Sequence, residues 1–142
     1  MAIYTVGYAA SGSDQEVVRL MADPQMLLID IRLRPVSRFR PEWRKAALIT
    51  AYGPRYLHLS GLGNVNYKNR EKGIELCAPD VPLAQLCRLM ERGYSLVLLC
   101  ACAAYESCHR RMVYDLLLAR SLPISGGKTP LESPVCLREE TL

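Results

Sequence analysis

Two runs of consecutive apolar residues constrain the fold more than any other feature of the sequence. Residues 26–31 read MLLIDI and residues 95–100 read SLVLLC, so neither run alternates regularly between apolar and polar side chains. A strand with one face in water alternates in this way, whereas a strand buried on both faces does not, and such strands are typical of parallel sheets covered by helices. We therefore expect both runs to be strands of a parallel sheet.

Further strand and helix patterns alternate around these two runs. β-branched and aromatic residues predict strands at 3–8 and 55–59. Apolar residues at helical spacing, with capping signals, predict the following helices: 13–23, 42–52, 81–91 and 106–122. Residues 60–79 are rich in glycine and asparagine and predict a long loop. Strands that alternate with helices indicate an α/β fold, so we predict a mostly parallel sheet of about four strands flanked by helices.

The length of 142 residues, of which 50% are apolar and 23% are charged, fits a single globular domain. We assign residues 1–122 to this domain and residues 123–142, which contain repeated prolines and glycines, to a loosely structured C-terminal tail. The sequence has no apolar stretch of about 18 residues and no signal peptide, so we expect a cytoplasmic protein without a membrane partner. The sequence does not indicate an oligomeric state.

Positive charge is concentrated in the middle of the chain. Residues 30–72 contain ten basic and three acidic side chains, a net charge of +7, and because the whole chain carries +4 the remainder carries −3. Clustered cations raise the local concentration of anions, so an anionic small molecule or a nucleic acid would be a suitable partner. The alternative interpretation is a solvated, arginine-rich surface.

Cysteine and basic residues fill the loop that follows the second apolar run. Six cysteines in a chain without an export signal are expected to be thiols rather than disulfides. Cys100 ends the predicted strand, and Cys108, His109 and Arg110 lie near the start of the predicted helix. Amides in the first turn of a helix and neighbouring cationic side chains stabilise a thiolate, so we expect the pKa of Cys108 to be lowered.

Three uses of these cysteines stay open from the sequence alone. Cys100 or Cys108 could be a nucleophile or sulfur carrier, with His109 transferring a proton. Cys100, Cys102, Cys108 and His109 could instead hold zinc, although their spacing is irregular, and our preferred interpretation includes no metal and no cofactor. Cysteine is also among the most buried residue types, so the thiols could simply fill space. The remaining cysteines are expected to have no role in catalysis: Cys77, Cys87, Cys102 and Cys136.

A second group of candidate residues follows the first apolar run. Asp30 belongs to that run, and Arg32, Ser37 and Arg38 come after it in a segment that contains a proline. Guanidinium groups at the end of a strand can bind a phosphate or carboxylate through paired hydrogen bonds. We predict that Arg32, Ser37, Arg38 and Arg110 bind an anion and that Asp30 orients an arginine. The alternative is an Asp30–Arg32 ion pair that only organises the loop.

Ligands of parallel sheets bind beyond the carboxyl ends of the strands, so we expect the two groups to meet around one pocket. The leading hypothesis is an anion-accepting pocket whose thiolate could act on a phosphorylated or sulfur-containing substrate, with Cys100, Cys108, His109 and Asp30 as catalytic candidates. The alternative is a non-catalytic module that binds nucleic acid or a nucleotide, with four aromatic side chains available for stacking: Trp43, Tyr52, Tyr56 and Tyr67. Motifs for triphosphate hydrolysis, dinucleotide binding and serine hydrolase chemistry do not occur.

Several short segments, spread in order over residues 3–120, together resemble the family known as domain of unknown function 488. The segments that carry the resemblance are Thr5–Tyr8; Ile29–Arg32 with Pro35 and Ser37–Arg38; Tyr56–Leu59 with Leu62–Gly63; and Leu99–Ala101 with Cys108–Arg110. Members of this family generally have no established biochemical activity, so the resemblance implies no particular reaction.

Two positions depart from the pattern of that family. Ala9 stands where serine usually follows Gly-Tyr, and Cys102 stands where glutamate usually follows Cys-Ala, so a thiol replaces a carboxylate near Cys100. A weaker resemblance is to rhodaneses, which also combine an Asp-x-Arg segment after an early strand with a cysteine at the end of a later strand. That resemblance would make Cys100 a thiolate that accepts sulfur.

Overall fold

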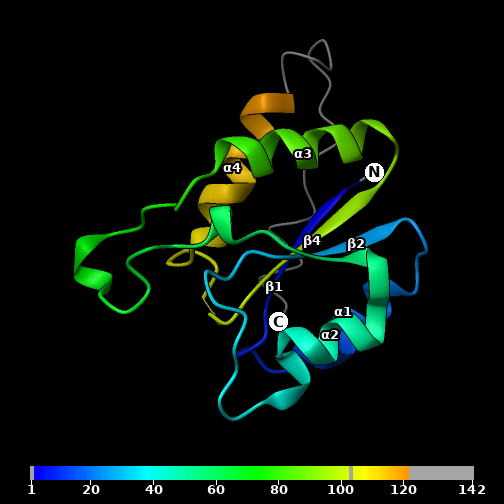
Figure 1. The fold of residues 1–142 in the computed structure, drawn as a ribbon, viewed down its shortest axis with the longest axis horizontal. Coiled ribbons are helices and arrows are strands. Elements are labelled where there is room, and N and C mark those ends of the chain that lie inside the picture. The colour runs from blue at the N-terminus through cyan, green and yellow to red at the C-terminus, as the bar shows by residue number, and fades with distance from the viewer. Residues whose placement is uncertain (1, 103, 122–142) are drawn as a thin grey trace.

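The protein folds around a four-stranded parallel sheet. A computed structural model describes residues 2–102 and 104–121, so the tail predicted at residues 123–142 lies outside the described residues. The strands run in the order β1-β4-β2-β3, and each neighbouring pair is parallel (Figure 1). Their bounds are Ile3–Gly7 for β1, Met26–Asp30 for β2, Tyr56–His58 for β3 and Ser95–Cys100 for β4. The predicted α/β fold with a parallel sheet is confirmed.

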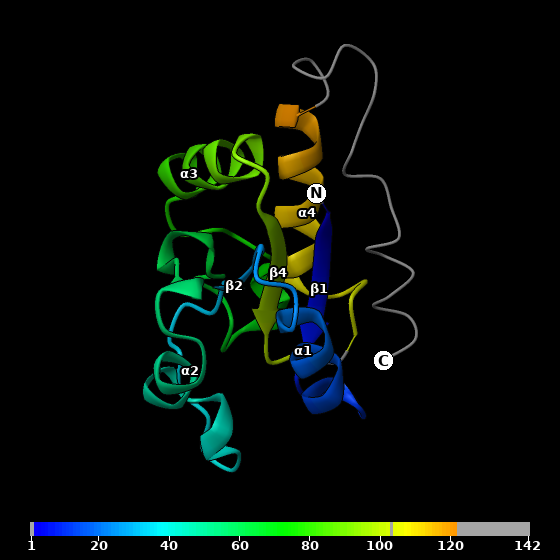
Figure 2. The same cartoon turned by 90° about the vertical axis from the view of Figure 1, so that its right-hand side faces the viewer.

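Helices cover both faces of this sheet, and Figure 2 shows the strands between them. Their bounds are Ser13–Met21 for α1, Lys45–Tyr52 for α2, Asp80–Glu91 for α3 and His109–Ser121 for α4. Leu96, Leu98 and Cys100 of β4 belong to the core packed against α3 and α4, whereas Val97 and Leu99 belong to the core packed against α1 and α2. Successive side chains of β4 thus alternate between two apolar layers, which explains why its sequence does not alternate.

The register of the central strand decides which side chains share a face. β4 pairs with β1 and with β2, and this pairing places Gly7 beside Cys100 and Asp30 beside Leu99. Residues paired in neighbouring parallel strands point to the same face of a sheet. Asp30 therefore points toward the α1–α2 layer, and Cys100 points toward the α3–α4 layer.

The helix predicted at 42–52 is interrupted near its start. A 3-10 turn at Pro41–Trp43 is separated from α2 by Arg44, whose backbone is extended with φ −77° and ψ 151°. The break follows from contacts outside the helix, because the amide of Lys45 donates to the carbonyl of Pro35 at 3.2 Å and Arg44 Nε donates to the carbonyl of Ser37 at 2.8 Å. The prediction of one continuous helix was therefore wrong for its first residues.

The segment between β3 and α3 contains little regular structure, as predicted for residues 60–79. Short 3-10 turns at Ser60–Leu62 and Arg70–Lys72 and a bridge between Asn64 and Leu76 organise it. Figure 1 shows this segment, in green, reaching outward from the body of the molecule. It is long enough to bring side chains to a site that the sheet alone could not enclose.

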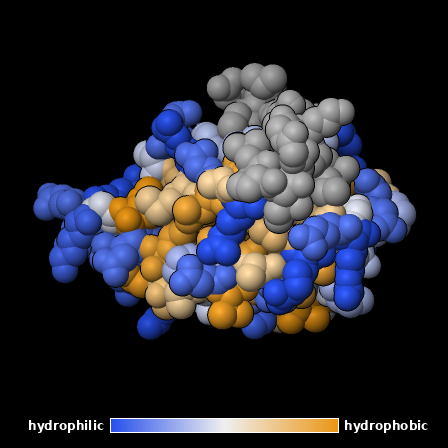
Figure 3. All heavy atoms as spheres, turned by 90° about the horizontal axis from the view of Figure 1, so that it is seen from above, coloured by the Kyte–Doolittle hydropathy of each residue, from blue (hydrophilic) through white to orange (hydrophobic). Residues whose placement is uncertain are grey.

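The outer surface of the α3–α4 layer is not uniformly polar. Figure 3, which views the molecule from that side, shows apolar side chains gathered in a patch between polar ones. Among the residues that the structure describes, no helix combines the length and the apolar character needed to cross a membrane.

Candidate functional site

Cys100 is held at the carboxyl end of β4 by the backbone. The amide of Tyr8 donates to the carbonyl of Cys100 at 3.0 Å, and the amide of Ala9 donates to the carbonyl of Ala101 at the same distance. The side chain of Cys100 is 1% exposed and lies in the α3–α4 core. The loop after β1 therefore fixes the position of the first thiol.

Cys108 lies directly before the first residue of α4. The amide of Cys108 donates to the carbonyl of Tyr105 at 3.1 Å, and this turn directs the side chain back toward the start of the helix. The amide of Arg110 points at Cys108 Sγ at 3.5 Å. The sulfur thus occupies the place of an N-terminal capping acceptor, where the amides of the first helical turn favour negative charge.

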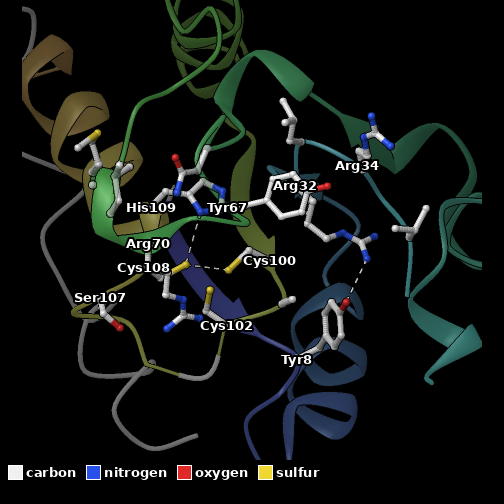
Figure 4. Close-up of a pocket in the computed structure, with 17 residues that line it drawn as sticks. Tyr8, Arg32, Arg34, Tyr67, Arg70, Cys100, Cys102, Ser107, Cys108 and His109 are labelled. Carbon is white, nitrogen blue, oxygen red and sulfur yellow. Dashed lines mark hydrogen bonds between the residues drawn. The ribbon is translucent and has the colours of Figure 1, made fainter. Parts of the chain in front are cut away.

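Three sulfur atoms gather at this point. Cys100 Sγ and Cys108 Sγ are 2.9 Å apart, and the sulfurs of Cys100, Cys102 and Cys108 all lie within 4.8 Å of one another (Figure 4). Cys102, for which no catalytic role was predicted, thus lies beside the two candidate thiols. Cys77 is exposed and Cys87 is half-buried, away from this cluster, and Cys136 lies outside the described residues.

The spacing of Cys100 and Cys108 suits a hydrogen bond better than a shared zinc ion. Two thiolates bound to one tetrahedral zinc at about 2.3 Å stand roughly 3.8 Å apart, clearly farther than the 2.9 Å between these sulfurs. A hydrogen bond from a thiol to a thiolate allows the two sulfurs to lie closer together than two ligands of one zinc ion do. Cys100, Cys102 and Cys108 could approach one thiophilic ion only if Cys100 and Cys108 moved apart, and the zinc alternative stays a prediction.

Arg110 and His109 surround Cys108 with donors. The guanidinium of Arg110 is fully buried, with Nε donating to Cys108 Sγ at 3.3 Å and Nη2 donating to the carbonyl of Cys102 at 3.1 Å. His109 Nε2 lies 2.8 Å from the carbonyl oxygen of Ile31, and Nδ1 lies 3.7 Å from Cys108 Sγ. A carbonyl only accepts, so we assign the proton to Nε2. Nδ1 faces Cys108 Sγ and, when it carries a proton as well, donates to the thiolate.

These contacts shift the pKa values of the two closest cysteines in opposite directions. Hydrogen bonds from Cys100 and Cys102 lower the pKa of Cys108, as do His109 and the charge of Arg110, and together they outweigh the opposing effect of burial. Burial raises the pKa of Cys100, and its contacts with the other two thiols raise it further. Cys108 is therefore the thiolate and Cys100 the thiol that donates to it.

Arg32 is locked in a buried network on the opposite face of β2. Its Nε and Nη2 donate to the two carboxylate oxygens of Asp30 at 2.8 and 2.6 Å, and Nη2 also donates to the carbonyl of Trp43 at 2.7 Å. Tyr56 donates its hydroxyl to Asp30 at 2.6 Å. Burial acts to lower the pKa of Arg32, but Asp30 outweighs it and raises that pKa. Burial and the bond to Asp30 also raise the pKa of Tyr56.

A cavity of about 700 Å³ connects the thiol cluster with the arginine segment (Figure 4). Cys100, Cys102, Cys108 and His109 line it from one part of the chain. Arg32 and Arg34 line it from the segment after β2, and the outward-reaching segment contributes several residues: Asn64, Tyr67, Arg70, Gly73 and Ile74. Among the described residues that form the wall, three are arginines and none is aspartate or glutamate.

The other predicted site residues lie outside this wall. Asp30 is buried on the α1–α2 face and reaches the cavity only through Arg32. Arg110 lies behind Cys108. Ser37 is buried, with its carbonyl bound by Arg44, and Arg38 is exposed, with its guanidinium 5.9 Å from the centre of the Phe39 ring. The structure therefore brings Cys100, Cys108, His109 and Arg32 together and leaves Ser37 and Arg38 apart.

Sequence reasoning did not select two arginines that line the cavity, Arg34 and Arg70. Arg34 belongs to the predicted arginine segment but was not selected, because nothing in the sequence distinguishes it from its neighbours. Arg70 comes from the predicted loop at 60–79, whose length alone indicated a functional role, and Tyr67 of the same loop was proposed only for stacking on bases. Which of its side chains reach inward depends on the folded path of the loop.

The fold and the site define a single-domain α/β protein with a thiol cluster at the carboxyl edge of a parallel sheet. The chain belongs to the family described as Domain of unknown function DUF488, whose model matches residues 14–117. No curated protein and no solved structure matches the chain. The family resemblance drawn from the sequence is thus confirmed, whereas the weaker resemblance to rhodaneses finds no support.

Proposed function

We propose that this protein is an enzyme that uses Cys108 as a nucleophile on a small anionic substrate. The observation that carries the proposal is the surrounding of Cys108 Sγ: the Cys100 thiol at 2.9 Å, Arg110 Nε at 3.3 Å and the Arg110 amide at 3.5 Å. A thiolate is the nucleophilic form of cysteine, and these donors stabilise it near neutral pH.

The cavity supports a role in catalysis rather than in packing. Cys100 and Cys108 are only 1% and 2% exposed, yet both belong to the cavity wall, so the cavity is the route by which a reactant reaches them. Burial of a charged thiolate destabilises a fold, so packing alone does not explain a thiolate at this position. His109 Nδ1 can take up or return the proton of the attacking or leaving group.

The arginines of the wall favour a substrate with negative charge. Arg34 and Arg70 are exposed side chains of the wall, and among the ion pairs of the residues that the structure describes, none joins either of them to a carboxylate. The charge of Arg32 is already neutralised by Asp30, so Arg32 forms part of the cavity wall but attracts an anion less strongly than an unpaired arginine does. We therefore assign recognition of the anion to Arg34 and Arg70.

Alkylation with iodoacetamide, resolved by peptide mass, tests the nucleophile. An ordinary thiol with a pKa of about 8.5 is roughly 0.3% ionised at pH 6, so alkylation of free N-acetylcysteine, the reference thiol, should accelerate about 75-fold between pH 6 and pH 8. Alkylation of Cys108 should proceed at pH 6 and change little over this range. A rate at Cys108 that rises in parallel with that of the reference thiol, or no labelling of Cys108 at any pH, would contradict the proposal.

Comparison of iodoacetate with iodoacetamide tests the anion site. The two reagents are similar in size and differ in charge, so their rate ratio measures attraction of the anion. The ratio at Cys108 should exceed that at Cys77 and should fall in Arg34→Gln and Arg70→Gln. An unchanged ratio in both variants would remove these arginines from substrate recognition.

A second candidate function, binding of nucleic acid, is favoured by one exposed loop. Phe39 is 86% exposed and Val36 is 68% exposed, next to the exposed guanidinium of Arg38. Exposed aromatic and cationic side chains stack on bases and contact phosphates. Trp43 and Tyr56, which the sequence offered for stacking, are buried and cannot serve. Binding of labelled single-stranded oligonucleotides that weakens with salt, and is lost in Phe39→Ala, would support this function.

A further inference from the structure

We propose that Cys100 is a resolving thiol and that the site reduces small disulfides that carry a negative charge. The inference rests on the proposed function, since Cys108 must attack first. Cys100 Sγ lies 2.9 Å from Cys108 Sγ, which is only about 0.9 Å longer than a disulfide bond of ~2.05 Å. A nucleophile with a second thiol in contact can release its covalent product without any other reductant.

The chemistry proceeds by two exchanges. The Cys108 thiolate attacks one sulfur of the disulfide R–S–S–R, forms a mixed disulfide with one R–S group and expels the other as R–S⁻. Cys100 then attacks Cys108 Sγ and displaces the second R–S group, which takes the proton of Cys100 and leaves as R–SH, while the Cys100–Cys108 disulfide forms. The two cysteine sulfurs are oxidised to a disulfide, and the substrate disulfide is reduced to one thiolate and one thiol, so atoms, charge and electrons balance.

The electrostatics of the cluster favour this order of events. While Cys108 is a thiolate, its charge raises the pKa of Cys100 and keeps that thiol protonated. Formation of the mixed disulfide removes the negative charge from Cys108, which had raised the pKa of Cys100. The positive charge of the buried Arg110 guanidinium, which lowers the pKa of Cys100, is then no longer opposed by the thiolate. The first step therefore prepares the second thiol for attack.

Cys102 is the other thiol near enough to compete for this role. It is only half-buried, and its carbonyl, rather than its sulfur, is bound by Arg110 Nη2. The 2.9 Å contact belongs to Cys100, which β4 and the amide of Tyr8 hold in place. The backbone position of Cys100 thus selects it over Cys102.

The cavity indicates which disulfides fit. Its volume of about 700 Å³ admits a small molecule, and its wall offers Arg34 and Arg70 for a carboxylate beside the apolar side chains of Leu33, Val36 and Ile74. A short aliphatic disulfide with terminal carboxylates matches both features.

Mass spectrometry of the fully reduced full-length protein, treated without air, tests the resolving thiol. With 3,3′-dithiodipropionate the wild-type protein and Cys102→Ser should become lighter by two hydrogen atoms and yield a Cys100–Cys108 cross-linked peptide. Cys100→Ser should instead keep one propionate thiol attached to Cys108. Rapid loss of the adduct from Cys100→Ser through a Cys102–Cys108 disulfide, or an adduct that persists in the wild type, would overturn the proposal.

Three disulfides of similar size test the charge preference. The anionic 3,3′-dithiodipropionate should react at least about tenfold faster than the cationic cystamine at low ionic strength, with the neutral 2-hydroxyethyl disulfide between them. Added salt should narrow the differences between the three reaction rates. The double variant Arg34→Gln with Arg70→Gln should narrow them as well. Equal rates for all three would refute the anionic substrate class.

The experiments separate this inference from the proposed function. If Cys108 is alkylated rapidly at pH 6 but the wild-type mixed disulfide is never resolved, Cys108 is a nucleophile and Cys100 is not its resolving thiol. If Cys108 is not alkylated, both proposals fail.

Discussion

His109 Nε2 lies 2.8 Å from the carbonyl oxygen of Ile31, and this contact joins the start of α4 to the residue that follows β2. The two residues are 78 positions apart in the chain. The bond turns the opposite ring nitrogen toward Cys108. One backbone carbonyl therefore sets the orientation of a side chain that faces the candidate nucleophile.

Two substitutions of His109 separate its anchoring contact from its contact with sulfur. His109→Gln keeps a donor for Ile31 and removes the ring nitrogen beside Cys108, so the pKa of Cys108 should rise and its alkylation at pH 6 should slow. His109→Asn keeps a polar atom near Cys108 and loses the anchor, so it should lower the melting temperature more than His109→Gln. Identical pH profiles for wild type and His109→Gln would show that the ring does not act on the thiolate.

Asp30 should be essential for stability because it neutralises a buried cation. Asp30→Ala leaves the guanidinium of Arg32 buried without its carboxylate, and we expect a loss of about 3–5 kcal/mol in the free energy of unfolding. The double variant Asp30→Ala with Arg32→Met removes both charges and should recover much of that loss. Urea denaturation measures both changes. No recovery in the double variant would mean that Asp30 stabilises the fold by contacts other than the ion pair.

Tyr56 should make stability depend on alkaline pH. Tyr56→Phe removes a buried hydrogen bond to a carboxylate and should cost about 1.5–3 kcal/mol at pH 7. Because the pKa of Tyr56 is raised in the folded protein, the unfolded chain loses this proton first, at about pH 10. The difference in the free energy of unfolding between the wild type and Tyr56→Phe should therefore shrink as the pH rises from about 9 to 11.

The matched control for this prediction is Tyr67→Phe. Tyr67 is 43% exposed, so removal of its hydroxyl should change stability little at any of these pH values. A wild-type advantage over Tyr56→Phe that stays constant with pH would contradict the assignment.

Gly7 should be irreplaceable because of the turn that carries Cys102. A Cβ at residue 7 would lie 1.5 Å from the Cys102 carbonyl oxygen and 2.8 Å from Arg110 Nη2. Gly7→Ala must displace this backbone, so we expect a loss of about 3 kcal/mol and slower alkylation of Cys108. Gly12→Ala is the control, since residue 12 has open space and a φ of 84°, and it should cost about 1–2 kcal/mol without changing the thiol. Equal effects on alkylation would exclude a specific role of Gly7.

The strands and the central thiols could be predicted because their signals are local. The buried runs mark β2 and β4 directly, and Cys100 and Cys108 stand at a strand end and a helix start, where parallel sheets place ligands. The distribution of residues over the two faces could not be predicted. Asp30 and Cys100 both belong to predicted strands, but only the register that pairs Asp30 with Leu99 places them on opposite faces.

Tertiary contacts account for the remaining differences. Arg44 interrupts a helix without any proline or glycine at that position, because contacts of this segment with Pro35 and Ser37 hold it extended. Arg70 reaches the cavity from a segment with little regular structure, whose path depends on packing against the rest of the protein. Such positions depend on partners distant in the chain, which local patterns do not contain.

The strand that carries Cys100 is paired along its length on both sides. Backbone amides in the middle of such a sheet exchange with solvent deuterium only when the whole domain unfolds, whereas those of exposed turns exchange through small local openings. The resolving thiol would thus rest on the slowest-exchanging part of the molecule. Any motion that admits a reactant must then come from the segments around it, so the turn before α4 and the residues near Arg70 should take up deuterium first.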